Sequence, residues 1–157
     1  MSTQTRPARN EVKILADHRA HKQLGNWTTS RDFEIRSRHG RVVLDLRSPQ
    51  IPEGDIRIGL ELDRSSVTLL VAEDAVIDHW DLAWTGRGKV KQTFHHPAAS
   101  AGRRVRLTGH IRHGEVRVLS GGIAQLSAIC SREFLADARR AQAGGRLPTV
   151  DDPARGA

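Results

Sequence analysis

Apolar and polar side chains alternate along several short segments between residues 33 and 119. In an extended strand successive side chains point to opposite faces, so this alternation gathers the apolar side chains on one face. The clearest example is IRIGLELD at residues 56–63, and the pattern recurs, in places weakly, at residues 42–47, 67–71, 76–84 and 104–111. These segments predict half-buried β-strands separated by turns rich in Gly, Pro and Ser.

A glycine-led step, Gly-x-[Val/Ile]-x-apolar, introduces several of these segments. It occurs at Gly40, Gly54 and Gly114, with an imperfect copy at Gly88 and a serine-led copy at Ser65. Glycine permits a tight backbone step before a strand. The four glycines are separated by 14, 34 and 26 residues, which is too irregular for a strict solenoid repeat. We therefore predict a mainly β fold, an irregular β-roll or loose β-helix, with a β-sandwich as the alternative.

The chain of 157 residues fits a single domain. Near the C-terminus we predict an α-helix, because Ser131 is a suitable N-cap and a Gly-Gly pair at 144–145 would end the helix. Both polar ends offer little apolar area to offset the entropy of ordering them. The predicted organisation is a flexible N-terminal segment (1–25, in which Asn10 to Gly25 could form a short helix), a β-rich domain (26–120), a C-terminal helix packed on it (121–145) and a flexible tail (146–157).

The chain has three Trp and no Tyr, and the positions of two of the tryptophans can be predicted from the strand pattern. Trp80 and Trp84 share strand parity with Leu82, so we expect both to pack in the core or at a sheet edge rather than to stack on a ligand. An aromatic fraction of 4% also offers few platforms on which the bases of a nucleic acid could stack.

The positive charge is concentrated in one quarter of the chain. The formal net charge is +7, and residues 85–120 alone contain eight Lys or Arg against the single acid Glu115. Basic surfaces attract anionic partners, including lipid headgroups, acidic or phosphorylated proteins, and the phosphates of nucleic acids. The candidate anion-binding or partner-binding residues are Arg87, Lys89, Lys91, Arg103, Arg104, Arg106 and Arg112.

Adjacent strands could merge these cations into one positive stripe, with Lys89 and Lys91 on one strand face and Arg104 and Arg106 on another. The alternative is a solvated face, since exposed Lys and Arg also protect strand edges from aggregation.

Catalytic and metal-binding motifs are absent from the sequence. His110 and His113 differ by an odd number and would point to opposite strand faces, and neither they nor the adjacent His95 and His96 belong to a zinc-type ligand set. Cys130 stands alone in an apolar stretch, where a thiol is usually inert. The glycine-rich TGRGK at 85–89 lacks the spacing of a phosphate-binding loop and is typical of a basic β-hairpin turn. We therefore predict a non-enzymatic protein without catalytic residues, metal or cofactor.

The single cysteine, the lack of a secretory signal and the lack of ~18 consecutive apolar residues predict a cytoplasmic protein without a transmembrane segment. We expect a protein partner or an anionic surface, with nucleic acid as another candidate partner. Unpaired strand edges also offer a route to homo-oligomers.

The segment VVLDLRSPQIPEGDIRIGLELDRSSVTLLVAEDAVIDHWDL, followed by TGRGKVKQTF and VRLTGHIRHGEVRV, resembles the C-terminal domain of LiaF-like proteins, the bacterial cell-wall-active-antibiotic-response family. The resemblance covers residues 27–120. It rests on Leu44-Asp45-Leu46 as a leading strand, on Val67 to Ala72 as a middle strand and on Gly114 to Val118 as a closing strand. Two features depart from the family pattern: Ala72 replaces the proline that usually follows the middle strand, and no transmembrane segment precedes the domain.

The resemblance implies a β-rich, helix-like roll without catalytic residues, used in sensing and regulation of envelope stress. Together with the charge distribution, it predicts a small non-enzymatic regulatory, scaffold or binding protein of a bacterium. The first alternative is a weak, nonspecific nucleic-acid-binding protein that acts through a basic strand face. A residual alternative is an enzyme that uses the histidines between residues 95 and 113.

Overall fold

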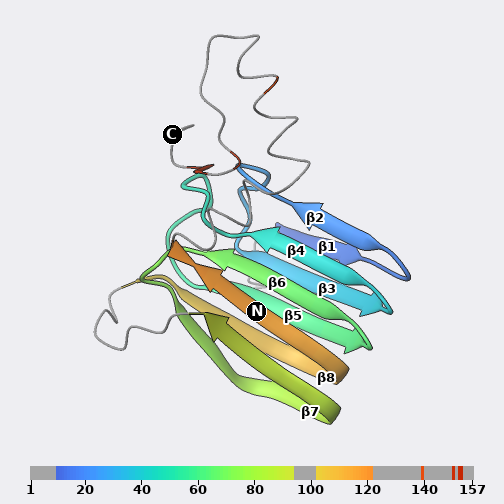
Figure 1. Cartoon of the computed structure of the whole chain (residues 1–157). Coiled ribbons are helices and arrows are strands. Elements are labelled where there is room, and N and C mark those ends of the chain that lie inside the picture. The colour runs from blue at the N-terminus through green and yellow to red at the C-terminus, as the bar shows by residue number, and fades with distance from the viewer. Residues whose placement is uncertain (1–9, 94–101, 122–138, 140–149, 151, 154–157) are drawn as a thin grey trace, which may run out of the picture.

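The computed structural model describes residues 10–93, 102–121, 139, 150, 152 and 153 of the chain. Eight strands form one sheet in which every pairing is parallel. The strands are β1 (Glu11–Leu15), β2 (Ala20–Gln23), β3 (Asp32–Arg38), β4 (Arg41–Asp45), β5 (Ile56–Asp63), β6 (Ser66–Val71), β7 (Val76–Thr93) and β8 (Arg104–Ser120). Figure 1 shows them side by side in a curled sheet. The predicted mainly β, helix-like roll is thus confirmed, and the alternative of a sandwich is not.

The sheet is built from five coils stacked on one another. Each of the first three coils is a pair of strands joined at a corner, namely β1 with β2, β3 with β4, and β5 with β6. The long strands β7 and β8 each form a whole coil and bend at the same position as the other corners. We name the coils 1 to 5 in chain order, so that β7 is coil 4 and β8 is coil 5.

The spatial order of the coils differs from their order in the sequence. β8 pairs on one side with β5 and β6 and on the other side with β7. Coil 5 is therefore inserted between coils 3 and 4, and β7 becomes an edge strand. Residues 72–75 connect β6 to β7 across the gap that coil 5 fills.

The core is formed by rows of apolar side chains on the concave face of the sheet, in which residues in register on neighbouring strands stack into ladders. In the first strands Phe33, Ile58 and Leu107 occupy one ladder position, and all three are buried. In the second strands, ladders of the same kind are formed by Val42, Val67 and Val116, and by Leu44, Leu69 and Val118. Val42, Leu44, Ile58, Val67, Leu69 and Leu107 are residues that the alternation of period two assigned to the interior. Each such side chain contributes about 1.5–3 kcal/mol when it is removed from water.

The loops between coils close the open side of the core. Ile51, in the loop between β4 and β5, is 1% exposed and belongs to the core cluster. Trp27, in the loop between β2 and β3, packs on Phe33 with ring centroids 5.6 Å apart and donates its indole N–H to the carbonyl of Asp45 at 2.7 Å. The loops are therefore part of the hydrophobic core.

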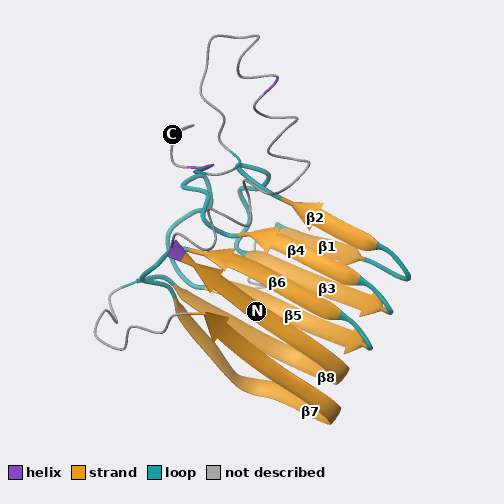
Figure 2. Ribbon diagram, viewed as in Figure 1, coloured by secondary structure: helices purple, strands orange, loops and turns teal. Residues whose placement is uncertain are grey.

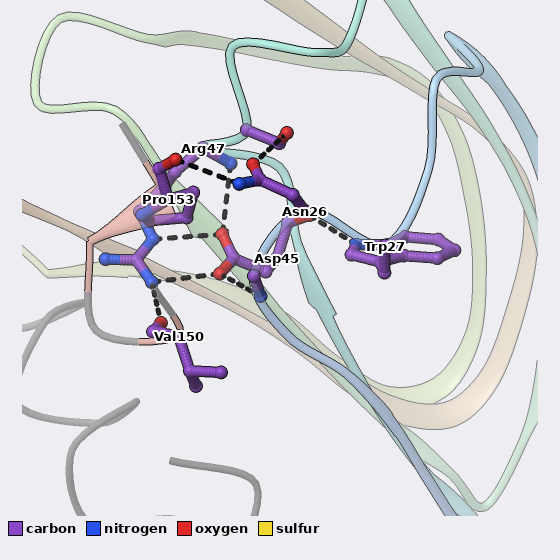
Figure 3. A network of polar contacts seen from close by, with 8 residues as sticks. Asn26, Trp27, Asp45, Arg47, Val150 and Pro153 are labelled. Carbon is purple, nitrogen blue, oxygen red and sulfur yellow. Dashed lines mark hydrogen bonds and ion pairs between the residues drawn. The ribbon is translucent and has the colours of Figure 1, made fainter. Parts of the chain in front are cut away.

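A buried ion pair lies where the second strands end. Arg47 donates to both carboxylate oxygens of Asp45, and it also donates to the carbonyl of Val150 at 3.0 Å. Asn26 donates to the carbonyl of Pro153 at 3.0 Å. Figure 3 shows that this network joins two loops of the roll to residues close to the C-terminus.

The prediction for the N-terminal segment is wrong. Residues 10–25 do not form a helix or a flexible segment, because Glu11–Leu15 and Ala20–Gln23 are strands of coil 1. Val12, Ile14 and Ala16 continue the alternation into this region, and Ile14 and Ala16 are buried.

Trp80 does not pack in the core, since it is 93% exposed. A register shift between Asp78 and Asp81 breaks the parity that links Trp80 to Leu82, so Leu82 is buried without it. Trp84 does pack against the core, as predicted.

The predicted C-terminal helix at 121–145 and the flexible tail at 146–157 lie almost entirely outside the described residues, as do residues 1–9. His95, His96 and Cys130 are also outside them.

Candidate functional site

The corners of the five coils lie in one row, which Figure 2 shows for the three loops that join the first strands to the second strands. At each corner one residue adopts the left-handed conformation, with φ between 49° and 52° at His18, His39, Arg64 and His113 and 75° at Gly86. Four of the five are not glycine, although this conformation is uncommon for other residues. The sheet register therefore imposes it at each corner.

Hydrogen bonds between neighbouring corners hold the row together. The N–H groups of His18, His39 and Arg64 each donate to a carbonyl of the next coil, at 2.8, 2.9 and 2.9 Å. On the other side of the corner Ser66 donates to the carbonyl of Gly40, and Glu115 donates to that of Ser65. The corner backbone is thus as well paired as the strands.

The repeated Arg-His-Gly tripeptide is the sequence mark of this corner. A Cβ at Gly40 would lie 2.1 Å from the carbonyl oxygen of Ala16, and one at Gly114 would lie 2.8 Å from that of Ser65. Only glycine allows the coils to approach so closely. Gly40, Gly54 and Ser65 precede strands, as predicted, whereas Gly88 and Gly114 lie inside the continuous strands β7 and β8. Four of the five copies, all except Gly54, mark the same corner.

These four copies also recur at a nearly regular spacing, which is hidden when Gly54 is counted with them. Without Gly54, which precedes the first strand of coil 3, the intervals from Gly40 to Ser65, Gly88 and Gly114 are 25, 23 and 26 residues. They are close to one coil length each.

The row of corners forms the floor of a groove of about 1110 Å³. Its lining includes five Lys or Arg residues and three histidines but one carboxylate, Glu115. All eight basic side chains are exposed: Arg19, Arg41, Arg64, Arg87, Lys89, His18, His39 and His113. We call this surface the corner groove.

The histidines of the corner groove are placed by stacking and by backbone contacts. The rings of His18 and His39 stack with centroids 5.0 Å apart and an interplanar angle of 16°. His113 lies against Gly86, where an added Cβ would come within 2.2 Å of its ring, and its Nδ1 accepts the N–H of Arg87 at 3.3 Å.

The one carboxylate of the groove is neutralised by its neighbours. Glu115 lies 3.3 Å from the Lys91 ammonium and 3.2 Å from the Arg117 guanidinium. Burial opposes its ionisation, but the hydrogen bonds from Arg117 and Lys91 outweigh burial and lower the pKa of Glu115. The corner groove therefore keeps an excess of positive charge.

The two lysines near the end of β7 crowd one another. Hydrogen bonding with Lys91, followed by the charge of Lys91, lowers the pKa of the exposed Lys89. This end of β7 contains no carboxylate of its own, and Lys91 forms its ion pair with Glu115 of β8.

The predicted basic residues are divided between several places. Arg87 and Lys89 line the corner groove, Lys91 lies next to Lys89 on β7, and Arg112 lies one residue before the corner of β8. These four remain candidates for anion binding. The groove residues contributed by coils 1 to 3 were not among the predicted candidates. The available signal was the repeated Arg-His-Gly tripeptide, which marks the corners of coils 2 and 5.

The other three predicted residues lie away from the groove, so that the seven residues do not form one stripe. Arg104 and Arg106 are near the start of β8, opposite Val76 and Asp78, and Arg106 forms an ion pair with Asp78 at 3.7 Å. Arg103 donates to the carbonyl of Ile51 at 3.1 Å, and burial lowers its pKa.

The prediction of a β-hairpin turn at residues 85–89 is wrong, because β7 continues through this glycine-rich segment as the corner of coil 4. In the described part of the chain, no three His, Cys, Asp or Glu side chains gather closely enough to hold a metal ion. Nor does that part contain a helix long and apolar enough to span a membrane.

Comparisons with protein-family models, with curated proteins and with solved structures found no match to this chain. The resemblance to LiaF-like domains therefore stays a prediction, and function has to be argued from the corner groove.

Proposed function

We propose that the protein is a non-enzymatic binding protein, regulatory or scaffolding in role, that holds an acidic segment of a protein partner in the corner groove. The observation that carries this proposal is the convergence of eight exposed basic side chains, from all five coils, on a groove whose one carboxylate is already neutralised.

The spacing of the cations suits an extended ligand with repeated negative charge. Neighbouring coils are about 4.8 Å apart, so side chains at equivalent corner positions recur at that interval along the groove. His39 of coil 2 and Arg64 of coil 3 are examples, since each is the left-handed residue of its corner, and each would meet a different charge of such a ligand. Rows of cations attract acidic chains from a distance and raise the rate of association.

The polar groups of the groove floor favour binding over catalysis. The Ser65 hydroxyl donates to the carbonyl of Asp63 and accepts the N–H of Gly40, so it serves the corner rather than a reaction. His113 Nδ1 accepts a backbone N–H rather than the proton of a hydroxyl nucleophile.

Nucleic acid is the alternative ligand, because the same cations could contact phosphates. Proteins that bind single strands usually add aromatic side chains on which bases stack, and the described lining of the groove contains no Trp or Phe. This lack of stacking platforms favours the acidic protein segment.

The test measures binding of a fluorescent oligoglutamate peptide and of single-stranded DNA of equal charge, by anisotropy at several salt concentrations. We expect the peptide to bind, and the Arg41→Glu, Arg64→Glu double variant to weaken binding by about tenfold or more and to reduce the salt dependence. Arg36→Glu with Arg57→Glu is the matched control, since both residues are exposed on first strands outside the groove. Equal losses in the two variants would contradict the groove as the site, and tighter binding of DNA would favour the alternative.

A cytoplasmic location and a part in envelope-stress regulation of a bacterium belong to this proposal as well. The first is supported by the single cysteine and the second by the resemblance to LiaF-like domains. Fractionation of the native cell, with detection by an antibody, would test the location.

A further inference from the structure

β7 is a long edge strand with an unused side. It spans Val76–Thr93, and among the described strands only β8 pairs with it. In the described part of the chain no strand pairs with the N–H and C=O groups on its outer side. Register shifts between Asp78 and Asp81 and between Thr85 and Gly88 distort the edge locally, as is common for edge strands. Trp80, on this strand, is the most exposed large hydrophobic residue of the described chain, at 93%.

The charges along β7 separate into two arms on either side of the corner. The arm before the corner carries the acids Asp78 and Asp81, whereas the arm after it carries Lys89 and Lys91, with Arg87 at the corner itself. We call these the acidic arm and the basic arm. The basic arm crowds two ammonium groups, as the lowered pKa of Lys89 indicates.

A parallel, head-to-tail stack of copies would bring like charges together. Following the ladders across the sheet, Glu11 of coil 1 occupies the same position as Asp78 of β7, and Lys22 occupies the same position as Lys91. If coil 1 of one copy paired in register with β7 of another, Glu11 would face Asp78 and Lys22 would face Lys91. These two like-charge pairs outnumber the one favourable pair in the same register, Lys13 with Asp81. Like charges directly opposite one another in a sheet are destabilising.

An antiparallel pair of β7 strands has the opposite electrostatics. A two-fold axis through the corner of β7 exchanges the two arms, so the acidic arm of each copy lies along the basic arm of the other. The exposed Trp80 would then be brought toward the basic arm of the second copy, where Lys ammonium groups can contact the indole face. An isologous interface of this kind closes on itself and stops at two copies.

We propose that the protein forms a two-fold symmetric dimer by antiparallel pairing of the β7 edges, with the acidic arm of each copy against the basic arm of the other. The dimer joins the corner grooves of the two copies end to end across the two-fold axis. The proposal does not depend on what the groove binds.

Charge exchange between the two arms tests the dimer directly. The Asp78→Lys, Asp81→Lys variant has two basic arms, and the Lys89→Asp, Lys91→Asp variant has two acidic arms. In sedimentation velocity at low salt we expect the wild-type chain at twice its own mass and each variant at its own mass. We expect an equimolar mixture of the two variants to sediment at twice the mass again, because both arms of the mixed pair attract.

Recovery in the mixture also shows that both variants are folded, since misfolded chains would not pair selectively. The matched control is Asp55→Lys with Glu61→Lys, which makes the same charge change on exposed residues outside β7 and should leave the dimer intact. A wild-type chain that stays monomeric, a mixture that stays monomeric, or variants that associate like the wild type would each overturn the proposal. Oligomers that grow with concentration beyond two copies would also overturn it and would indicate head-to-tail stacking.

Discussion

Asp45 and Arg47 form a bidentate ion pair inside the protein, with both N to O distances at 2.9 Å. The Asp45 carboxylate is fully buried, and the Arg47 side chain is 11% exposed. The remaining capacity of the carboxylate is used by the backbone N–H groups of Gly25 and Arg47, each at 3.0 Å. Every partner of Asp45 thus lies in the loops at the ends of coils 1 and 2.

Removal of Arg47 should therefore be strongly destabilising. We expect Arg47→Met to lower the free energy of unfolding by about 3–5 kcal/mol, because it leaves a buried carboxylate without its cation. The double variant Asp45→Asn, Arg47→Met should lose less than the sum of the two single variants. Urea denaturation followed by circular dichroism measures all three, and additive losses would show that the pair is not coupled.

Two glycines in neighbouring coils should respond differently to the same substitution. A Cβ at Gly109, where φ is 109°, would lie 2.1 Å from the carbonyl oxygen of Leu60, whereas one at Gly59 would meet nothing closer than 3.9 Å. We expect Gly109→Ala to cost about 2–4 kcal/mol, from backbone strain and overpacking. Gly59→Ala should change stability by less than about 1 kcal/mol. Thermal unfolding of both variants checks this, and equal melting temperatures would contradict the close approach of β8 to β5.

The left-handed corner at Arg64 sets function against stability. At φ 49° the backbone of Arg64 is in a left-handed conformation that is strained for a residue with a Cβ, and glycine would adopt it without this cost. We expect Arg64→Gly to leave the free energy of unfolding unchanged or to raise it by up to about 1 kcal/mol, and to weaken binding of the anionic peptide. Parallel measurements of unfolding and binding test this trade-off. A large loss of stability would mean that the side chain of Arg64 supports the fold.

The insertion of β8 between coils 3 and 4 predicts which substitutions have local effects. Leu107 of β8 is fully buried between two neighbours, whereas Leu82 of the edge strand is 8% exposed. Leu107→Ala should cost about 3–5 kcal/mol, and Leu82→Ala about 2 kcal/mol. In amide hydrogen exchange, Leu82→Ala should reduce protection in β7 alone, while Leu107→Ala should reduce it on both sides of β8. Loss of protection confined to β8 in the Leu107 variant would contradict this topology.

Much of the fold could be predicted from local pattern. The alternation at 56–63 identified β5 to the residue, and it assigned Val42, Val67 and Val105 correctly to the interior. Where the prediction failed, the reason is specific. Trp80 lies outside the core because a β-bulge between Asp78 and Asp81 changes the face to which it points. Residues 10–25 were predicted to form a helix, although the same alternation of apolar and polar residues continues through them.

The candidate site was less predictable than the strands. Clustering of charge along the chain identified Arg87 and Lys89, but the rest of the groove comes from coils that are remote in sequence. Arg41 and Arg64 were not candidates, because each appears in the sequence as an ordinary exposed residue next to a strand.

The sequence by itself determined where most of the strands run and which of their side chains face the core, because side-chain direction in a strand alternates locally. Gly40, Gly88 and Gly114 also mark three of the five corners. Only the tertiary structure decided that the last coil lies between the third and the fourth, that β7 is an edge, and that the corners align into a basic groove. Those features depend on backbone hydrogen bonds between parallel strands. Such bonds use the same N–H and C=O groups whatever the side chains are, so the order in which the coils stack leaves no local mark in the sequence.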